Sequence, residues 1–136
     1  MNKALLFIAI ALITSFSSCT KDLATDWIGT YNGTVGSTFN RVIVSKVNKT
    51  TVKVELQQYY LPTTSYITYA TMNNGKLSSD NALSVNEDGT IITDPGLTFH
   101  FTGVGSLNGN TLTLSGQAQN KSNSSDIRTY TFTGTK

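Results

Sequence analysis

The chain contains very little cysteine, histidine, proline or charge. Its 136 residues include one cysteine, one histidine and two prolines, and 13% of them are charged. One cysteine excludes a disulfide within the chain, and one histidine leaves almost no material for a histidine-based triad or metal site. Ten basic and eight acidic residues give a net charge of +2, which excludes the electrostatic footprint of a typical nucleic-acid-binding protein. The length suits a single domain.

The one long apolar run lies at the N-terminus, over residues 4–13. It is too short to cross a bilayer core as a helix, which takes about 20 residues. Lys3 precedes it, and a mostly small and polar segment, 14–19, follows it. This arrangement is typical of a secretion signal. The sole cysteine, Cys19, stands where cleavage is expected.

The segment ending in Ser17, Ser18 and Cys19 resembles the lipobox of bacterial lipoproteins, in which two small residues precede a lipidated cysteine. Phe16 replaces the usual leucine, a relaxed form similar to the lipobox of Bacteroidetes lipoproteins. The resemblance implies cleavage before Cys19, a diacylglyceryl thioether on its sulfur and palmitate-type acylation of the new amino terminus. An ordinary signal peptide with an incidental cysteine is the alternative.

This resemblance divides the chain into three parts: a signal peptide over 1–18, a lipidated tether over 19–25, and a domain over 26–136. It implies an outer-membrane lipoprotein held to the membrane through its N-terminal lipid. The periplasmic and the surface-exposed faces of that membrane both remain open, and so does the oligomeric state.

From Trp27 onward, apolar and polar residues alternate with a period near two, which predicts half-buried strands. Turn signals separate eight such segments, expected near 27–35, 39–47, 51–60, 66–72, 75–86, 97–107, 110–119 and 126–134. Parallel pairing needs long crossovers, so short loops predict an antiparallel up-and-down sheet. Closing it removes two exposed edges. The fold class predicted is therefore all-β, an eight-stranded barrel, with a two-sheet β-sandwich as the alternative.

Glycine and asparagine mark particular turns in this prediction. Asn108-Gly109 between two patterned runs predicts a two-residue type I′ hairpin. The segment 73–75, Asn-Asn-Gly, is expected to be another turn. Gly103 and Gly105 lie inside one predicted strand and suggest a bend or bulge where the sheet curls.

Both ends of the domain resemble the calycin group, the lipocalins and fatty-acid-binding proteins. The opening segment 26–31, Asp-Trp-Ile-Gly-Thr-Tyr, resembles their first strand, and Arg128-Thr129-Tyr130 resembles an Arg-x-Tyr pair that holds a lipid carboxylate. The resemblance implies a lipocalin-like barrel that binds a small ligand. Two departures stand out: no helical lid fits between the first two strands, and Arg128 begins the last strand, so it cannot reach Trp27.

The sequence shows no set of residues that could act together in catalysis, so the chain is not expected to be an enzyme or to need a cofactor or metal. His100 is opposite Phe99 and Phe101 on its strand and should face solvent. The acidic residues of 80–94 lie in or beside turns without the spacing of a calcium loop. The tyrosines of 59–69 could line a surface that stacks on sugars, or simply pack on the sheet.

The ligand hypothesis rests on Arg128, Tyr130, Phe99 and Phe101. Arg128 shares a strand face with Tyr130, so it should point inward and needs a partner. Because the acids are placed mostly in turns, a ligand carboxylate is one candidate partner, and escape of the side chain to water at the rim is the other. The expected function is non-catalytic binding of a small apolar or amphipathic ligand. The alternative is an envelope interaction or glycan-binding module that uses an exposed aromatic strand face.

Overall fold

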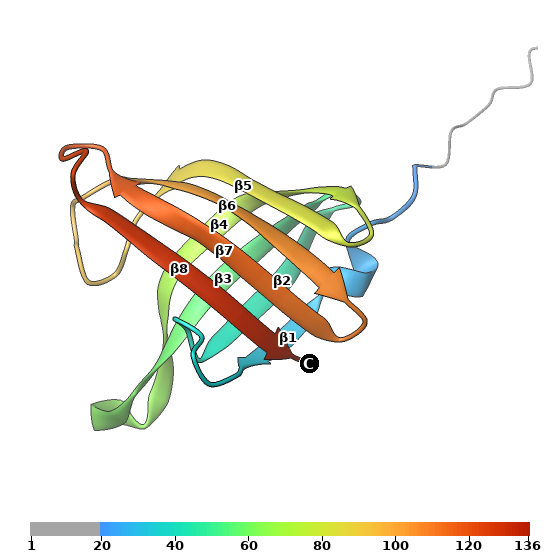
Figure 1. Ribbon diagram of the computed structural model, residues 1–136, viewed down its shortest axis with the longest axis horizontal. Coiled ribbons are helices and arrows are strands. Elements are labelled where there is room, and N and C mark those ends of the chain that lie inside the picture. Colours follow the sequence, from blue (N-terminus) through green and yellow to red (C-terminus); the bar gives the residue numbers. More distant parts are fainter. Residues whose placement is uncertain (1–19) are drawn as a thin grey trace, which may run out of the picture.

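The computed structural model describes residues 20–136; the predicted signal peptide 1–18 and Cys19 lie outside the described residues. Eight antiparallel strands, joined in chain order, form a closed barrel in which the first strand pairs with the last (Figure 1). The strands are β1 Gly29–Gly33, β2 Arg41–Asn48, β3 Thr51–Tyr60, β4 Ser65–Ser79, β5 Ala82–Gly89, β6 Phe99–Asn108, β7 Thr111–Asn120 and β8 Ile127–Thr135. Two short 3-10 segments are η1 Thr25–Trp27 and η2 Leu61–Thr63. The predicted barrel is confirmed, and the sandwich alternative is wrong.

Because of the period-two pattern, every second side chain of a strand points into the barrel. The inward sets predicted for the individual strands, such as Leu112 and Leu114 on β7, are buried. Large aromatic rings fill the interior together with the aliphatic ones: Trp27, Tyr31, Phe99, Phe101 and Phe132 are each at most 2% exposed. Within residues 20–136, no helix has the length and apolar character needed to cross a membrane.

Two predicted turns are wrong. The acidic residues Glu87 and Asp88, expected in a turn, lie within β5 and pair with Phe101 and His100.

Residues 73–75 do not end a strand, because β4 continues through them to Ser79 and the chain reverses at 80–81 instead. Gly75 pairs with Val52 beside a shift in register, and a Cβ at this glycine would lie 3.1 Å from the Val52 carbonyl oxygen. The Asn-Asn-Gly sequence therefore marks a β-bulge at which two backbones come close together. The continuous strand β4 runs through the position where a turn between two strands was expected.

Gly103 and Gly105 do not mark a bulge in β6, which was one of the two expectations for them. The pairing of β6 with β7 runs without a register shift from Phe99 to Asn108. Gly103 instead leaves room for the Tyr130 hydroxyl, which would lie 2.5 Å from a Cβ at that position. A glycine here thus accommodates a large ring from β8.

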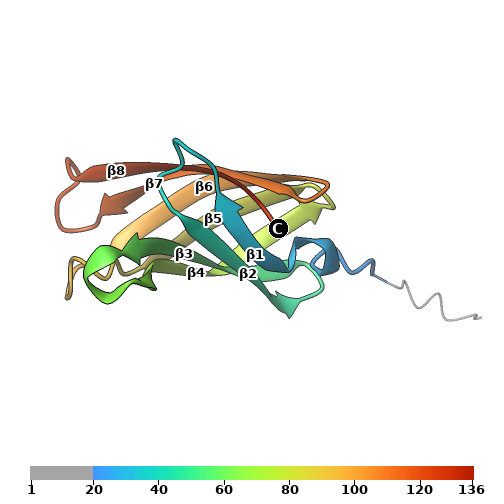
Figure 2. The ribbon, with the colours of Figure 1, turned by 90° about the horizontal axis from the view of Figure 1, so that it is seen from below.

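The barrel has two different ends. The plugged end carries η1, the hairpin turns at 49–50, 80–81 and 109–110, and the C-terminus, whereas the open end carries the longer loops 34–40, 61–64, 90–98 and 121–126 (Figures 1 and 2). At the plugged end the Tyr31 hydroxyl donates to the Trp27 carbonyl oxygen at 2.8 Å. Arg128 begins β8 at the open end, so it lies far from Trp27, as the topology predicted.

The expected tether, 19–25, is not a free linker from Lys21 onward. The backbone N–H groups of Leu23 and Ala24 donate to the Lys49 carbonyl oxygen at 2.8 and 3.1 Å, and Asp22 forms an ion pair with Lys46. Ala24 is fully buried. Burial of these side chains under the β2–β3 hairpin makes this segment part of the barrel's plugged end.

Gly109 should be sensitive to substitution because of its backbone. The loop residues are Gly109 and Asn110, and Gly109 alone has a positive φ, 58°, which fits a type II′ turn and corrects the predicted type I′. We expect Gly109→Val to lower the free energy of unfolding by at least about 1 kcal/mol through strain, although the side chain would meet no neighbour. Urea unfolding measures the loss; an unchanged midpoint would argue against the positive φ.

Candidate mouth pocket

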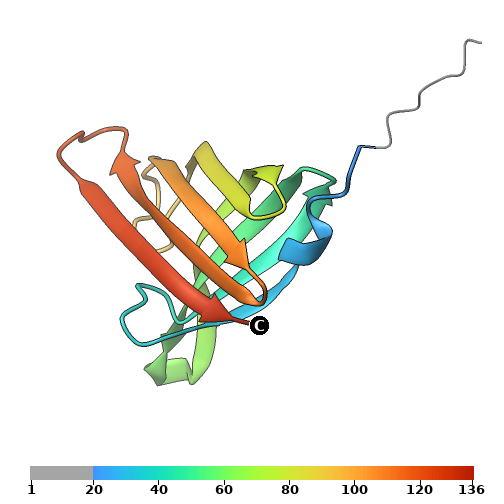
Figure 3. The same cartoon turned by 45° about the vertical axis from the view of Figure 1, so that its right-hand side comes forward.

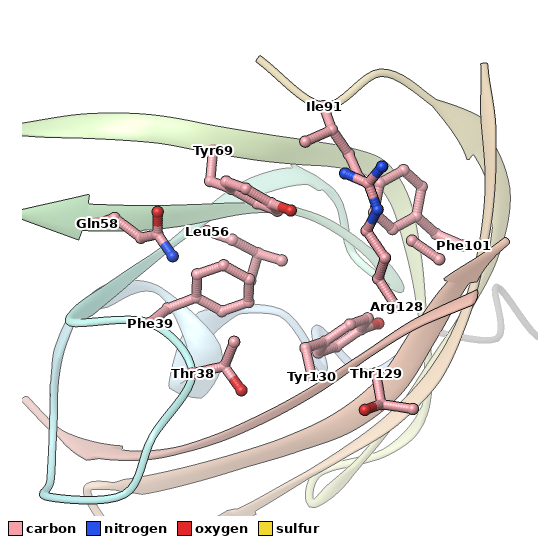
Figure 4. A pocket seen from close by; sticks show the side chains of 11 residues that line it. Thr38, Phe39, Leu56, Gln58, Tyr69, Ile91, Phe101, Arg128, Thr129 and Tyr130 are labelled. Carbon is pink, nitrogen blue, oxygen red and sulfur yellow. The ribbon is translucent and has the colours of Figure 1, made fainter. Parts of the chain in front are cut away.

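A small pocket opens inside the rim of the open end (Figure 4). Its volume is about 60 Å³. The lining residues come from five strands and two loops: Thr38, Phe39, Leu56, Gln58, Tyr69, Ile91, Phe101, Ala118, Arg128, Thr129 and Tyr130. Apolar side chains make the floor and walls, and polar groups lie at the rim. This combination is typical of small-molecule sites, although those usually measure about 300–1,000 Å³.

Three aromatic rings form the wall of the pocket. Phe39 lies between the other two, with ring centroids 5.3 Å from Tyr69 and 6.2 Å from Tyr130, at tilts of 45° and 52°. Phe39 belongs to the β1–β2 loop, which turns its ring back over the mouth. Tyr69 is the unpaired residue at a register shift in β4. Loop and bulge together therefore aim these rings at the same space.

The Tyr130 hydroxyl points to the interior. It lies 3.5 Å from the Thr102 carbonyl oxygen, as a long hydrogen bond, and 3.8 Å from the Met72 sulfur. Burial raises the pKa of Tyr130 to about 12, because the phenolate would lose its hydration. The ring thus presents its apolar face to the pocket, and the hydroxyl stays protonated near neutral pH.

Arg128 has two carboxylate partners from its own chain. Its Nη1 and Nη2 donate to Asp94 at 2.5 and 3.1 Å, and its Nε and Nη2 donate to Asp126, both at 3.1 Å. The guanidinium also lies over the Phe99 ring, 4.7 Å from its centroid. Neither partner considered from the sequence, a ligand carboxylate or water, includes these two acids, although a third of the Arg128 side chain does remain exposed at the rim. The turn 90–98 and the end of loop 121–126 bring the two acids to it.

This cluster carries one positive and two negative charges. The Arg128 guanidinium lowers the pKa of Asp94 to about 2 and also lowers the pKa of Asp126. Because the Asp94 pKa is depressed in the folded state, the ion pair stabilises the fold fully above about pH 4. That contribution is lost as the pH falls toward 2. At neutral pH the cluster has a net charge of −1 and repels an anion.

Three of the four predicted ligand-binding residues, Arg128, Tyr130 and Phe101, line the same pocket. Phe99 does not line it, because it is fully buried beneath Arg128. Sequence reasoning missed Phe39, and it assigned Tyr69 to a possible sugar-stacking surface rather than to this pocket, since nothing in a strand pattern reveals how a loop or a bulge turns a ring. His100 faces solvent as expected and lies 2.8 Å from Asp88.

A second feature of the open end is the β3–β4 hairpin, which extends beyond the barrel wall (Figure 3). Residues 57–68 contain no lysine, arginine, histidine or acidic residue. Tyr59, Tyr60 and Tyr66 are 38–46% exposed, and Leu61 at the apex is 76% exposed. The rings of Tyr59 and Tyr66 meet edge to face at 70°, and the Arg41 guanidinium covers the Tyr66 ring at 3.7 Å. We call this segment the tyrosine hairpin.

Comparison with known proteins finds no matching family model, no matching curated protein and no matching solved structure. Within residues 20–136, no group of three or more histidine, cysteine or acidic side chains converges as a metal site would require.

Proposed function

We propose that this chain is an envelope lipoprotein whose barrel mouth binds the apolar end of a small amphipathic molecule without catalysis. The observation that carries this proposal is the mouth pocket, where Phe39, Tyr69 and Tyr130 surround an opening with an apolar floor. Gln58, which lines the pocket, offers hydrogen bonds to a polar head group.

The size of the pocket limits what it holds. An engineered cavity of about 150 Å³ admits a benzene molecule, and the mouth pocket has about 60 Å³. It takes a short apolar group, such as the end of an alkyl chain, and leaves the rest of the molecule at the rim. A whole fatty acid inside the barrel, as the lipocalin resemblance implied, does not fit this conformation.

Charge limits the head group. Since Arg128 is already bonded to Asp94 and Asp126, its guanidinium is not free to bind a carboxylate. A neutral or cationic head group suits the net charge of −1 better than an anionic one. The proposed ligand is therefore a small, uncharged or cationic amphiphile.

The pocket can be tested by filling it. We expect n-hexyl β-D-glucoside to bind the mature chain carrying Cys19→Ala, and Ala118→Leu to weaken this binding at least tenfold, because the leucine occupies the pocket that Ala118 lines. Isothermal titration measures both affinities. Ala82→Leu, the same change at the plugged end of β5, is the control and should bind like the parent. Equal affinity in Ala118→Leu would refute the proposed site.

Membrane attachment is proposed from Cys19, the sole cysteine, which follows the apolar run and two serines. We expect labelled palmitate to enter the protein, and Cys19→Ala to abolish both the labelling and fractionation with membranes. Two or three acyl chains are sufficient for stable attachment, whereas one chain is marginal. A Cys19→Ala variant that still fractionates with membranes would contradict the anchor.

A second candidate function is protein docking through the tyrosine hairpin. Exposed tyrosines and a leucine on an uncharged, projecting ribbon favour it, because tyrosine and arginine are enriched at the centres of protein interfaces. The flat sugar-stacking surface considered above is less well supported. The rings of Tyr59 and Tyr66 are not coplanar, and Arg41 already covers Tyr66.

A further inference from the structure

We propose that the plugged end of the barrel is a membrane-contact surface, which rests on anionic lipid head groups and presents the mouth and the tyrosine hairpin away from the bilayer. This inference rests on the proposed acylation of Cys19. It goes beyond attachment, because an anchor on a long linker would impose no orientation.

The first observation is where the chain meets the fold. Lys21 forms an ion pair with Asp80 in the β4–β5 turn, and Asp22 forms another with Lys46 at the end of β2. With Leu23 and Ala24 bonded to Lys49, the N-terminal segment is fixed across the plugged end from Lys21 onward. Only Thr20 separates this fixed segment from Cys19. Two residue steps reach about 7 Å, so a lipidated Cys19 would bring the plugged end to the head groups.

The second observation is an asymmetry of charge along the barrel. The plugged half carries five lysines and three aspartates, a net charge of +2; they are Lys21, Lys46, Lys49, Lys76, Lys136, Asp22, Asp26 and Asp80. The open half carries three basic and four acidic residues, a net charge of −1; they are Arg41, Lys121, Arg128, Glu87, Asp88, Asp94 and Asp126. Lys53 and Glu55 pair with each other between the two halves. Anionic head groups attract the positive half and repel the other.

The side chains at the plugged end also suit an interface with head groups. All five of its lysines are exposed. Lys21 and Lys46 are held in ion pairs, whereas the long stems of Lys49, Lys76 and Lys136 can lie along lipid while their ammonium groups reach phosphate. Two exposed apolar residues stand among them: Ile28 is 41% exposed and Val47 is 53% exposed. The mouth pocket lies at the opposite end, so its ligand arrives from the aqueous side rather than from the supporting bilayer.

The orientation can be read with a fluorophore on a single free thiol, because acylation leaves Cys19 without one. Asn110→Cys labels the β6–β7 turn at the plugged end, and Ser122→Cys labels the β7–β8 loop at the open end; both positions are exposed. Ten-residue strands tilted by about 40° separate the two ends by about 25 Å. Each acylated, labelled protein is bound to phosphatidylethanolamine–phosphatidylglycerol vesicles that carry a lipid-linked acceptor dye.

We expect energy transfer to the bilayer to be at least threefold more efficient from position 110 than from position 122. Vesicle-bound protein with equal transfer from both positions, or with more from position 122, would overturn the orientation while leaving the anchor intact. Acylated protein that does not bind vesicles would overturn the proposed anchor and this surface together.

Discussion

Replacing Trp27 by alanine is expected to lower the free energy of unfolding by about 3–5 kcal/mol, which is the cost of deleting a fully buried large ring. Trp27 is 0% exposed and plugs the barrel from η1, where its carbonyl oxygen accepts the hydrogen bond of Tyr31. Its loss would leave a cavity that the closed sheet cannot collapse to fill. Urea unfolding followed by far-ultraviolet circular dichroism measures the change.

Two other variants keep this prediction decisive. Trp27→Phe should lose less stability, because a ring remains and because the indole N–H, which has no hydrogen-bond partner within residues 20–136, is removed. Val35→Ala, at a fully exposed loop position, should leave the midpoint unchanged. If Trp27→Ala cost less than about 1 kcal/mol, the N-terminal segment would be a detachable tether after all.

Removing both acids from Arg128 is expected to change the charge preference of the mouth. In the double variant Asp94→Asn and Asp126→Asn, the cluster changes from a net charge of −1 to +1, and the guanidinium becomes free to bind a carboxylate. We expect the affinity for hexanoate to rise at least tenfold, equivalent to about 1.4 kcal/mol. The affinity for hexyl glucoside, which has the same chain and a neutral head, should change much less.

The double variant Asp26→Asn and Asp80→Asn is the matched control, because it also removes two negative charges, but at the plugged end. Its affinity for hexanoate should equal that of the parent protein. Hexanoate that binds the parent as tightly as hexyl glucoside, or no gain in the variant that lacks both acids of the mouth, would show that the Arg128 cluster does not select the head group.

The architecture was predictable from the sequence because a period of two is a local signal. Alternation places Leu112 and Leu114 on one face whatever the rest of the chain does, and short loops permit only antiparallel neighbours. The continuation of β4 through Asn73-Asn74-Gly75 was not predictable in the same way. A bulge and a turn use the same residues, and here distant partners decide between them: Glu87 accepts hydrogen bonds from the backbone and side chain of Asn74.

The candidate site was only partly predictable. Arg128, Tyr130 and Phe101 could be assigned to the interior because they alternate along strands. The partner of Arg128 could not be predicted. Asp94 lies 34 positions earlier in the chain, and its Asp-Pro-Gly sequence is already accounted for by the turn that it forms. The sequence predicted an apolar or amphipathic ligand, with a carboxylate as one candidate partner of Arg128; the contacts with Asp94 and Asp126 lead us to propose a neutral or cationic head group instead.

Amide chemical-shift mapping shows whether the proposed ligand binds in the mouth. The ¹⁵N-labelled mature chain with Cys19→Ala would be titrated with n-hexyl β-D-glucoside. We expect the largest shifts to cluster at the mouth, around Phe39, Tyr69, Ile91 and Ala118, and the plugged end to stay unchanged. Shifts confined to the tyrosine hairpin, or no shifts at all up to saturating glucoside, would contradict binding in the mouth.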